Sequence, residues 1–244
     1  MNKNFLFLLL LTFLTNNKVL AQSRIQLETG FAQQYKNKLK ITPSTGTTVD
    51  FSKWNKGFEP YLRLEAFVNF LENHTIRLVY APLKISSQGQ SDATVNFNNT
   101  IFNANENLTI DYRFNSYRLT YAYALINNRT QKLDLGLTAK VREAQIKFSQ
   151  GARESQYGNN GFVPLIYFAF QVELIRDLYF YTDMDALAGP QGRALDVTAK
   201  VRKFFLDDFF LSLGGRILEG GADNEKVYTF SWFNFMSLDI GAVF

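Results

Sequence analysis

Acidic side chains at alternate positions give this chain one pair of residues that could carry out acid–base chemistry. Asp183 and Asp185 are two positions apart, so on an extended strand both carboxylates lie on the same face. Two neighbouring carboxylates could share the roles of general acid and general base. The single histidine, His74, lies beside a short turn at the opposite end of the expected strands and could not act with them. We therefore predict that the chain is not an enzyme and holds no metal or other cofactor.

Charges of both signs extend well beyond this aspartate pair and occupy one side of the predicted strands. We expect a charge cluster formed by Arg63, Glu65, Arg77, Asp183, Asp185, Asp196 and Lys200. Further charged residues of the same parity are Glu28, Arg118, Asp134, Lys140, Arg142, Glu173, Arg202, Arg216 and Asp239. Because buried charges need partners, mixed signs on one face favour mutual pairing over ligand binding.

The elements that position these charges are strands with one apolar and one polar face. Within residues 132–142, leucine, alanine and valine alternate with lysine, aspartate, threonine and arginine, which is the period of a strand. About ten such segments (8–12 possible) lie near 24–35, 57–70, 75–86, 108–125, 131–148, 161–175, 178–188, 193–204, 209–219 and 226–244. Short turns between them alternate with longer polar loops at 36–56, 87–107, 149–160, 189–192 and 220–225.

Two irregularities interrupt this alternation. Pro60, Pro82 and Pro164 fall inside predicted strands, roughly one membrane-spanning strand length of about 9–11 residues from the nearest short turn. Proline cannot donate to a β-ladder, so we expect all three at the outer rim, where the ladder can bulge or meet water. Around Asn115 and Ser116 the apolar parity changes. This change indicates either a β-bulge or a strand that rises past a membrane.

Composition excludes several other classes of protein. The 244 residues include 24 Phe, 12 Tyr and 2 Trp but no cysteine, so the chain has no disulfide framework. The first 21 residues contain two lysines and no acid, so the remaining balance is 24 basic minus 22 acidic residues, or +2. That balance is too even to predict binding to nucleic acid.

The first 21 residues have the features of a secretory signal peptide. Lys3 precedes an apolar stretch from Phe5 to Leu14 that is too short to span a membrane as a helix, and small residues lead up to Ala21. We predict cleavage near Ala21, which leaves residues 22–244 as a single domain. No later apolar run reaches the length of a membrane-spanning helix.

A signal peptide, about ten amphipathic strands and the final stretch SLDIGAVF together resemble a bacterial outer-membrane β-barrel, of the small porin-like type found in Bacteroidota. The resemblance implies an all-β fold, a single closed antiparallel transmembrane barrel with short periplasmic turns and longer extracellular loops. It implies location in the outer membrane, contact with its lipid, and recognition by the barrel-assembly machinery. In that family alternating apolar residues that end in an aromatic are the assembly signal, which here implies Leu238, Ile240, Ala242 and Phe244.

The predicted function is that of a structural, surface-interaction or small-solute permeation barrel with a lumen filled mostly by charges, and the extracellular ligand stays open. One alternative is a barrel enzyme at the outer rim, because Asp183 and Asp185 resemble one half of the catalytic set of the omptin proteases. The other half is missing, since His74 does not match it. A second alternative is a periplasmic, lipocalin-like binder of an apolar ligand, which requires the apolar parity to face inward.

Overall fold

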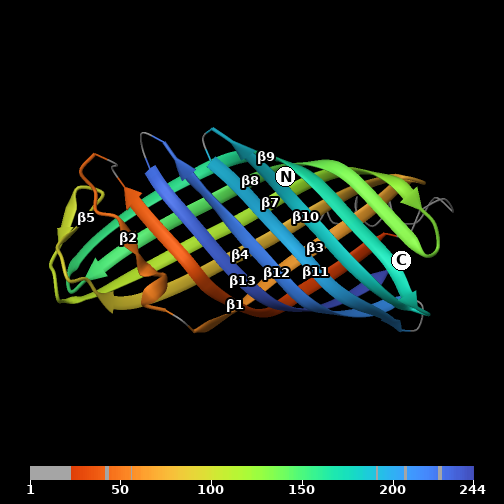
Figure 1. Ribbon diagram of the computed structural model, residues 1–244, viewed down its shortest axis with the longest axis horizontal. Coiled ribbons are helices and arrows are strands. Elements are labelled where there is room, and N and C mark those ends of the chain that lie inside the picture. Colours follow the sequence, from red (N-terminus) through yellow and green to blue (C-terminus); the bar gives the residue numbers. More distant parts are fainter. Residues whose placement is uncertain (1–22, 42–43, 56, 191, 206–207, 225–226) are drawn as a thin grey trace, which may run out of the picture.

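Ten long antiparallel strands form a closed barrel in the computed structural model, which describes residues 23–41, 44–55, 57–190, 192–205, 208–224 and 227–244 (Figure 1). These strands are β1 (Arg24–Ile41), β3 (Phe58–Leu71), β4 (His74–Gln90), β7 (Asn107–Asn127), β8 (Gln131–Gln150), β9 (Arg153–Ile175), β10 (Leu178–Gly189), β11 (Gly192–Phe205), β12 (Phe209–Asp223) and β13 (Val227–Val243). Each strand pairs with its neighbours in chain order, and β13 pairs with β1 to close the sheet. The predicted fold class is therefore confirmed. The predicted signal peptide lies outside the described residues.

The two ends of the barrel differ. Short connections at 72–73, 128–130 and 176–177, together with Asp208, lie at the end we call the turn end, where the backbones of Ser23 and Phe244 exchange two 2.9 Å hydrogen bonds. The other end, which we call the loop end, carries the longer connections. Within the described residues, no helix is long and apolar enough to cross a membrane.

The predicted loops are wrong in part, because the strands run further than their apolar alternation indicates. The stretch 149–160 is strand, because β8 and β9 continue to a tight turn at Gly151 and Ala152. Part of 36–56 is strand as well, since β1 runs on to Ile41 and a short strand β2 (Val49–Asp50) pairs with it. Polar residues occupy the outer face of both extensions, and in sequence such strands look like loops.

Smaller elements cover the loop end. A one-turn helix η1 (Phe51–Lys53) follows β2, and the hairpin of β5 (Val95–Phe97) and β6 (Thr100–Phe102) folds over the barrel. Phe97 stacks on Phe148 of β8, with 4.0 Å between the ring centroids. Phe51, Phe97, Phe102 and Phe148 are all fully buried. The loop end is thus closed by an apolar core rather than open to solvent.

The parity change in β7 is not a bulge. Asn115 pairs with Pro82 of β4 and with Glu143 of β8, and both registers run through this position without a shift. β7 has a register shift elsewhere, against β8 between Ala124 and Ile126, and β1 has one against β13 between Gln34 and Lys36. There the intervening Tyr35 is 64% exposed, and its ring lies 5.3 Å from that of Trp232.

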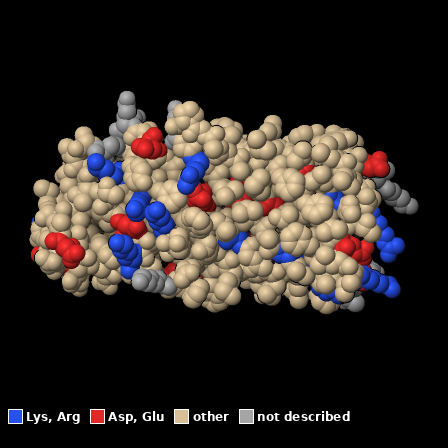
Figure 2. Space-filling model, viewed as in Figure 1, with Lys and Arg blue, Asp and Glu red and all other residues tan. Residues whose placement is uncertain are grey.

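What changes along the strands is the chemistry of the two faces. Toward the turn end the outward side chains are apolar and the inward ones charged, whereas toward the loop end the outward side chains are polar and the inward ones apolar. On β8, Leu137 is 69% exposed, while Ile146 and Phe148 of the other parity are buried. Figure 2 shows the same division, with most surface charge at the two ends and a mostly uncharged stretch between them. We call the part toward the turn end, whose outward side chains are apolar, the belt. We call the part toward the loop end, whose outward side chains are polar, the extension.

Two pairs of neighbouring strands separate at the border between the belt and the extension, and they leave gaps that we call seams. Pairing of β3 with β4 stops at Leu64 and Tyr80, and pairing of β9 with β10 stops at Ile166 and Ala186. Beyond these positions β9 continues toward the loop end paired only with β8. The β3–β4 seam is filled by the segment that contains η1, because Asn55 Nδ2 donates to the Ser86 carbonyl oxygen at 2.7 Å.

The three prolines that lie inside long strands are found beside these seams. Pro60 and Pro82 flank the β3–β4 seam, and Pro164 flanks the β9–β10 seam. A residue without an N–H suits a strand stretch that lacks one neighbour. The predicted outer-rim position is wrong for Pro82 and Pro164, because β4 continues to Gln90 and β9 begins at Arg153. All three prolines instead lie where a strand lacks one of its neighbours.

Candidate functional site

The charged side chains of the belt meet inside the barrel. All seven residues of the predicted charge cluster point inward, and none is more than 5% exposed. They come from four strands: Arg63 and Glu65 from β3, Arg77 from β4, Asp183 and Asp185 from β10, and Asp196 and Lys200 from β11.

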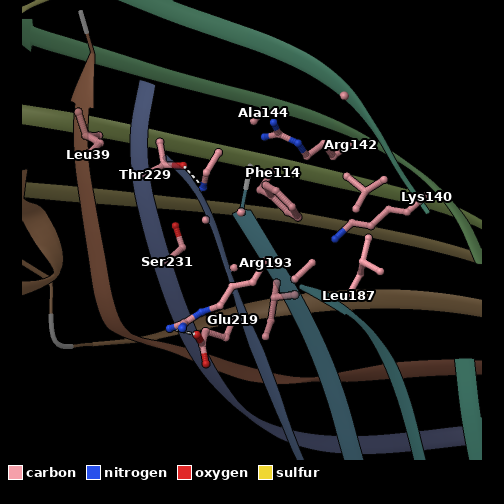
Figure 3. Close-up of a pocket in the computed structure, with 18 of the residues that line it drawn as sticks. Leu39, Phe114, Lys140, Arg142, Ala144, Leu187, Arg193, Glu219, Thr229 and Ser231 are labelled. Atoms are coloured by element: carbon pink, nitrogen blue, oxygen red, sulfur yellow. Dashed lines mark hydrogen bonds and ion pairs between the residues drawn. The ribbon is translucent and has the colours of Figure 1, made fainter. Parts of the chain in front are cut away.

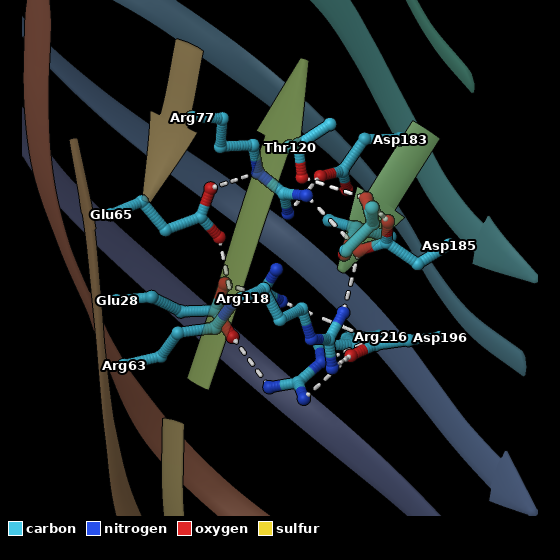
Figure 4. Close-up of polar contacts among 12 residues, drawn as sticks. Glu28, Arg63, Glu65, Arg77, Arg118, Thr120, Asp183, Asp185, Asp196 and Arg216 are labelled. Atoms are coloured by element: carbon cyan, nitrogen blue, oxygen red, sulfur yellow. Dashed lines mark hydrogen bonds and ion pairs between the residues drawn. The ribbon is translucent and has the colours of Figure 1, made fainter. Parts of the chain in front are cut away.

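Arg77 is the central cation on one side of the lumen. Its guanidinium nitrogens lie 3.1 Å from Glu65, 3.0 Å from Asp183 and 3.0 Å from Asp185 (Figure 4). Glu65 in turn forms a 2.7 Å ion pair with Arg63. The strands β3, β4 and β10 are thereby connected across the bore by charge-assisted contacts, which are stronger than neutral hydrogen bonds.

Four further charges complete the network, and all four belong to the wider set of inward-facing charges predicted from parity. Arg118 of β7 contacts Asp185 at 2.6 Å and also pairs with Asp196. Arg216 of β12 contacts Asp196 at 2.6 Å and Glu28 at 3.4 Å. Lys200 lies 2.7 Å from both Glu28 and Asp239. Five cations and six carboxylates therefore form a continuous set of ion pairs, which we call the charge plug.

Neutral side chains satisfy oxygens that the cations leave free. Thr138 Oγ1 donates to Asp185 at 2.6 Å, and the Tyr61 hydroxyl donates to Glu28 at 2.8 Å. Buried charges remain stable only when such partners complete their hydrogen bonding. The plug is therefore a packed interior.

Cavities lie on the two sides of the plug. One, of about 530 Å³, is lined at the turn end by residues that include Asn69, Arg129 and Asp177. The other, also about 530 Å³, lies in the part of the extension next to the belt and is lined by β8, β9, β10 and β13 among other strands (Figure 3). A solute would have to displace the charge plug to pass from one cavity to the other.

Three cations of the wider predicted set lie outside the plug, namely Arg202, Lys140 and Arg142. Arg202 lies between the rings of Tyr181 and Phe210, at 4.4 and 4.2 Å from their centroids, and donates to Gln26 at 3.1 Å. Lys140 Nζ lies 5.0 Å from the centroid of Phe114, at the loop-end cavity. Among the described residues, none of these cations has a carboxylate at ion-pairing distance.

The aspartate pair and His74 do not form a common site. Both carboxylates are bonded to Arg77 deep inside the barrel, away from the outer rim. His74 lies on the outer face at the turn end, where its Nδ1 is 2.8 Å from the Tyr121 hydroxyl. No group of three or more potential metal-ligating side chains occurs in the part of the chain that the structure describes.

The residues of the predicted assembly signal form an outward row on β13. Leu238, Ile240 and Phe244 are 37%, 55% and 59% exposed, and Ala242 is partly exposed between them. Their role in assembly stays a prediction.

No known family model matches the chain, and a search of curated proteins gives no match in sequence. Among solved structures, the outer membrane protease OmpT of Escherichia coli superimposes with a TM-score of 0.63 at 11% identity, covering 94% of this chain and 100% of OmpT. The chain has the fold of a bacterial outer-membrane β-barrel. The attachment invasion locus protein Ail of Yersinia pestis also matches, with a TM-score of 0.39 at 9% identity, covering 91% of this chain and 99% of Ail. Neisserial surface protein A matches with 0.38 at 13%, covering 91% and 97%. The last two likenesses are too distant to inform the site.

Proposed function

We propose that the protein is a closed, non-enzymatic barrel of the bacterial outer membrane that presents its extension at the cell surface. The observation that carries this proposal is the exchange of apolar and polar faces midway along the strands. β7, β8 and β9 contain 21, 20 and 23 residues, about twice the 9–11 residues that cross a bilayer. The belt accounts for one crossing, and the extension has the polar outside and apolar inside of a water-soluble barrel.

The outer face of the belt supports this placement. Leucines such as Leu119, Leu137 and Leu213 are 51%, 69% and 68% exposed, which would be unfavourable in water at about 25 cal/mol per Å². Outward aromatic rings also mark both borders. Phe205, Phe209 and Phe244 lie at the turn end, and Tyr80, Tyr117 and Phe162 lie at the border with the extension. Two aromatic girdles are typical of membrane barrels.

Not every aromatic residue near the turn end belongs to a girdle. Tyr181 and Phe210 are 5% and 1% exposed and face inward against Arg202. These two rings therefore belong to the packed interior at the turn end.

The charge plug favours a closed lumen rather than a permeation channel. Ten strands enclose a bore only slightly wider than the eight-stranded barrels that side chains fill, whereas open channels have 16–18 strands. The plug occupies this bore, and an apolar core covers the loop end above it. We infer a structural or surface-interaction role from this arrangement.

The two alternatives have less support. The structural neighbour OmpT is a protease, but here Asp183 and Asp185 are held by arginines inside the plug and His74 lies outside the barrel. The lipocalin-like alternative needs the apolar parity inside along the whole barrel. That arrangement holds in the extension, whereas in the belt the apolar parity faces outward.

Membrane placement can be tested by cysteine labelling, because the sequence contains no cysteine. Three single variants place a thiol in the extension (Gln145→Cys), the belt (Leu137→Cys) and a turn-end connection (Arg129→Cys). In intact cells a membrane-impermeant maleimide should label only Gln145→Cys, and permeabilised cells should add Arg129→Cys. Labelling of Leu137→Cys, or of Arg129→Cys in intact cells, would contradict the placement.

A further inference from the structure

The cavity at the loop end contains a buried lysine that, among the described residues, has no carboxylate at ion-pairing distance. Lys140 is 3% exposed, and Figure 3 shows its ammonium directed toward the middle of the cavity. The ammonium nitrogen lies 5.0 Å from the centroid of the Phe114 ring. The nearby carboxylates Asp185 and Asp196 are already engaged by Arg118. A buried charge without a counter-charge is costly, and an anionic ligand in the cavity would supply one.

A second cation lies in the same cavity. Arg142 donates to the Asn159 carboxamide at 3.2 Å and, among the described residues, has no carboxylate partner. Gly161 makes room for its guanidinium, since a Cβ at that position would lie 2.8 Å from Arg142 Nε. Arginine and lysine together favour an anionic head group such as a carboxylate.

The rest of the cavity is apolar and has the size of a ligand site. Val163, Leu187, Leu218 and Phe233 line it together with the Phe114 ring. Its volume of about 530 Å³ falls within the range of roughly 300–1,000 Å³ that small-molecule sites occupy. The lining therefore fits a ligand with an apolar body and one anionic end.

The β9–β10 seam connects this cavity with the outside of the belt. Phe162 and Pro164 of β9 and Leu187 of β10 line the cavity, and they lie where the two strands are no longer paired. Phe162 also projects outward with 67% of its side chain exposed. The seam begins at Ile166, whose side chain is 55% exposed within the apolar belt. An opening in the wall at this level faces lipid chains rather than bulk water.

We propose that the loop-end cavity binds a single-tailed amphiphile with an anionic head group, which enters from the outer leaflet through the β9–β10 seam. The head group is neutralised by Lys140 and Arg142, and the tail lies along the apolar residues toward the seam. This inference rests on the proposed placement of the belt in the bilayer.

Photolabelling of the whole barrel in phosphatidylcholine vesicles tests the ligand class. The probe is dodecanoate with a diazirine at the end of its tail, and insertion sites are mapped by mass spectrometry. We expect insertion at residues near Val163 and Leu187, competed by dodecanoate but not by hexanoate. A dodecyltrimethylammonium probe with the same diazirine should not label these residues. Equal labelling by the cationic probe, or equal competition by hexanoate, would overturn the proposal.

Variants identify the cation that recognises the head group. Lys140→Gln should reduce cavity labelling by about tenfold, which is the loss of one charge-assisted hydrogen bond. Lys140→Arg should retain it. Lys84→Gln, an exposed lysine on the outer face of β4, is the control and should leave labelling unchanged. Heat-modifiable gel mobility shows which variants are assembled barrels. Unchanged labelling of an assembled Lys140→Gln barrel would contradict the proposed site while leaving the membrane placement intact.

Closing the seam tests the route. Phe162→Cys and Ala188→Cys place two outward thiols on opposite sides of it, which a bismaleimide can join. Joining them before the probe is added should slow labelling of the cavity relative to the same double variant without the reagent. If the joined and unjoined forms are labelled at the same rate, the lateral route is wrong.

Discussion

Replacing Arg77 by methionine should destabilise the barrel strongly, because one guanidinium serves three buried carboxylates. Glu65 keeps Arg63 as a partner, and Asp185 keeps Arg118 and Thr138. Asp183 is different, since among the described residues its only ion pair is with Arg77. Breaking a buried pair by removing one partner costs about 3–5 kcal/mol. We expect Arg77→Met to lower the free energy of unfolding by that amount, mainly through Asp183.

The double variant isolates this cause. Adding Asp183→Asn to Arg77→Met removes the uncompensated charge, so the double variant should recover about 1–3 kcal/mol relative to Arg77→Met alone. Arg113→Met is the matched control, because Arg113 pairs with Glu143 at 2.7 Å but both side chains are more than one third exposed. An exposed pair contributes about 0–1 kcal/mol.

Urea-dependent folding into lipid vesicles, followed by tryptophan fluorescence and by heat-modifiable gel mobility, measures the free energy of unfolding. It is applied to the wild type, Arg77→Met, Asp183→Asn, the double variant and Arg113→Met. The reasoning would be refuted if Arg77→Met cost no more than Arg113→Met. It would also be refuted if Arg77→Met and Asp183→Asn were additive, because additivity would mean that the two charges do not interact.

Two further predictions concern the outer face. Leu137→Arg should destabilise the folded barrel in vesicles by about 2–4 kcal/mol. Gln145→Arg, on the same face of β8 but in the extension, should cost less than 1 kcal/mol. Equal costs in the same urea titration would argue against the border between belt and extension. Phe244→Asp should lower the amount of assembled barrel in the outer membrane without reducing export, because a carboxylate replaces an exposed aromatic ring of the predicted assembly signal. Quantitative blots of membrane and periplasmic fractions measure this, and unchanged membrane levels would mean that the signal lies elsewhere.

The strands of the belt could be predicted from sequence because their period depends only on which side of the sheet each residue faces. Residues 132–142 show the rule, since every predicted outward residue there is less buried than its inward neighbours Asp134, Thr138 and Lys140. The same rule placed all seven charges of the predicted cluster inside. It needs no knowledge of which strands are neighbours across the bore.

The extension was missed because its polar residues face water, as those of a loop do. Residues 149–160 are rich in Gln, Gly and Asn, and nothing local distinguishes them from a loop. What makes them strand is pairing over a distance, such as Tyr157 of β9 with Ile146 of β8. The bulge at Tyr35 is similar, because it depends on the register of β1 against β13.

The partners inside the plug also lay beyond the sequence. Arg77 meets Asp183 across the barrel, from strands that are not neighbours, and the stagger of the closed sheet decides which charges meet. For the same reason parity placed Lys140 inside but gave no sign that it lacks a carboxylate. One signal was present and only partly used, since the positions of Pro60, Pro82 and Pro164 mark the two seams.

Single-channel recording in planar bilayers tests the closed lumen most directly. Because the charge plug spans the bore between the two cavities, the wild-type barrel should show no steady conductance in 1 M KCl. The assembled Asp183→Asn, Asp185→Asn variant leaves Arg77 with Glu65 as its one carboxylate partner and should give a small, anion-preferring leak. A large and steady conductance from the wild-type protein would contradict the closed lumen and identify the barrel as a channel.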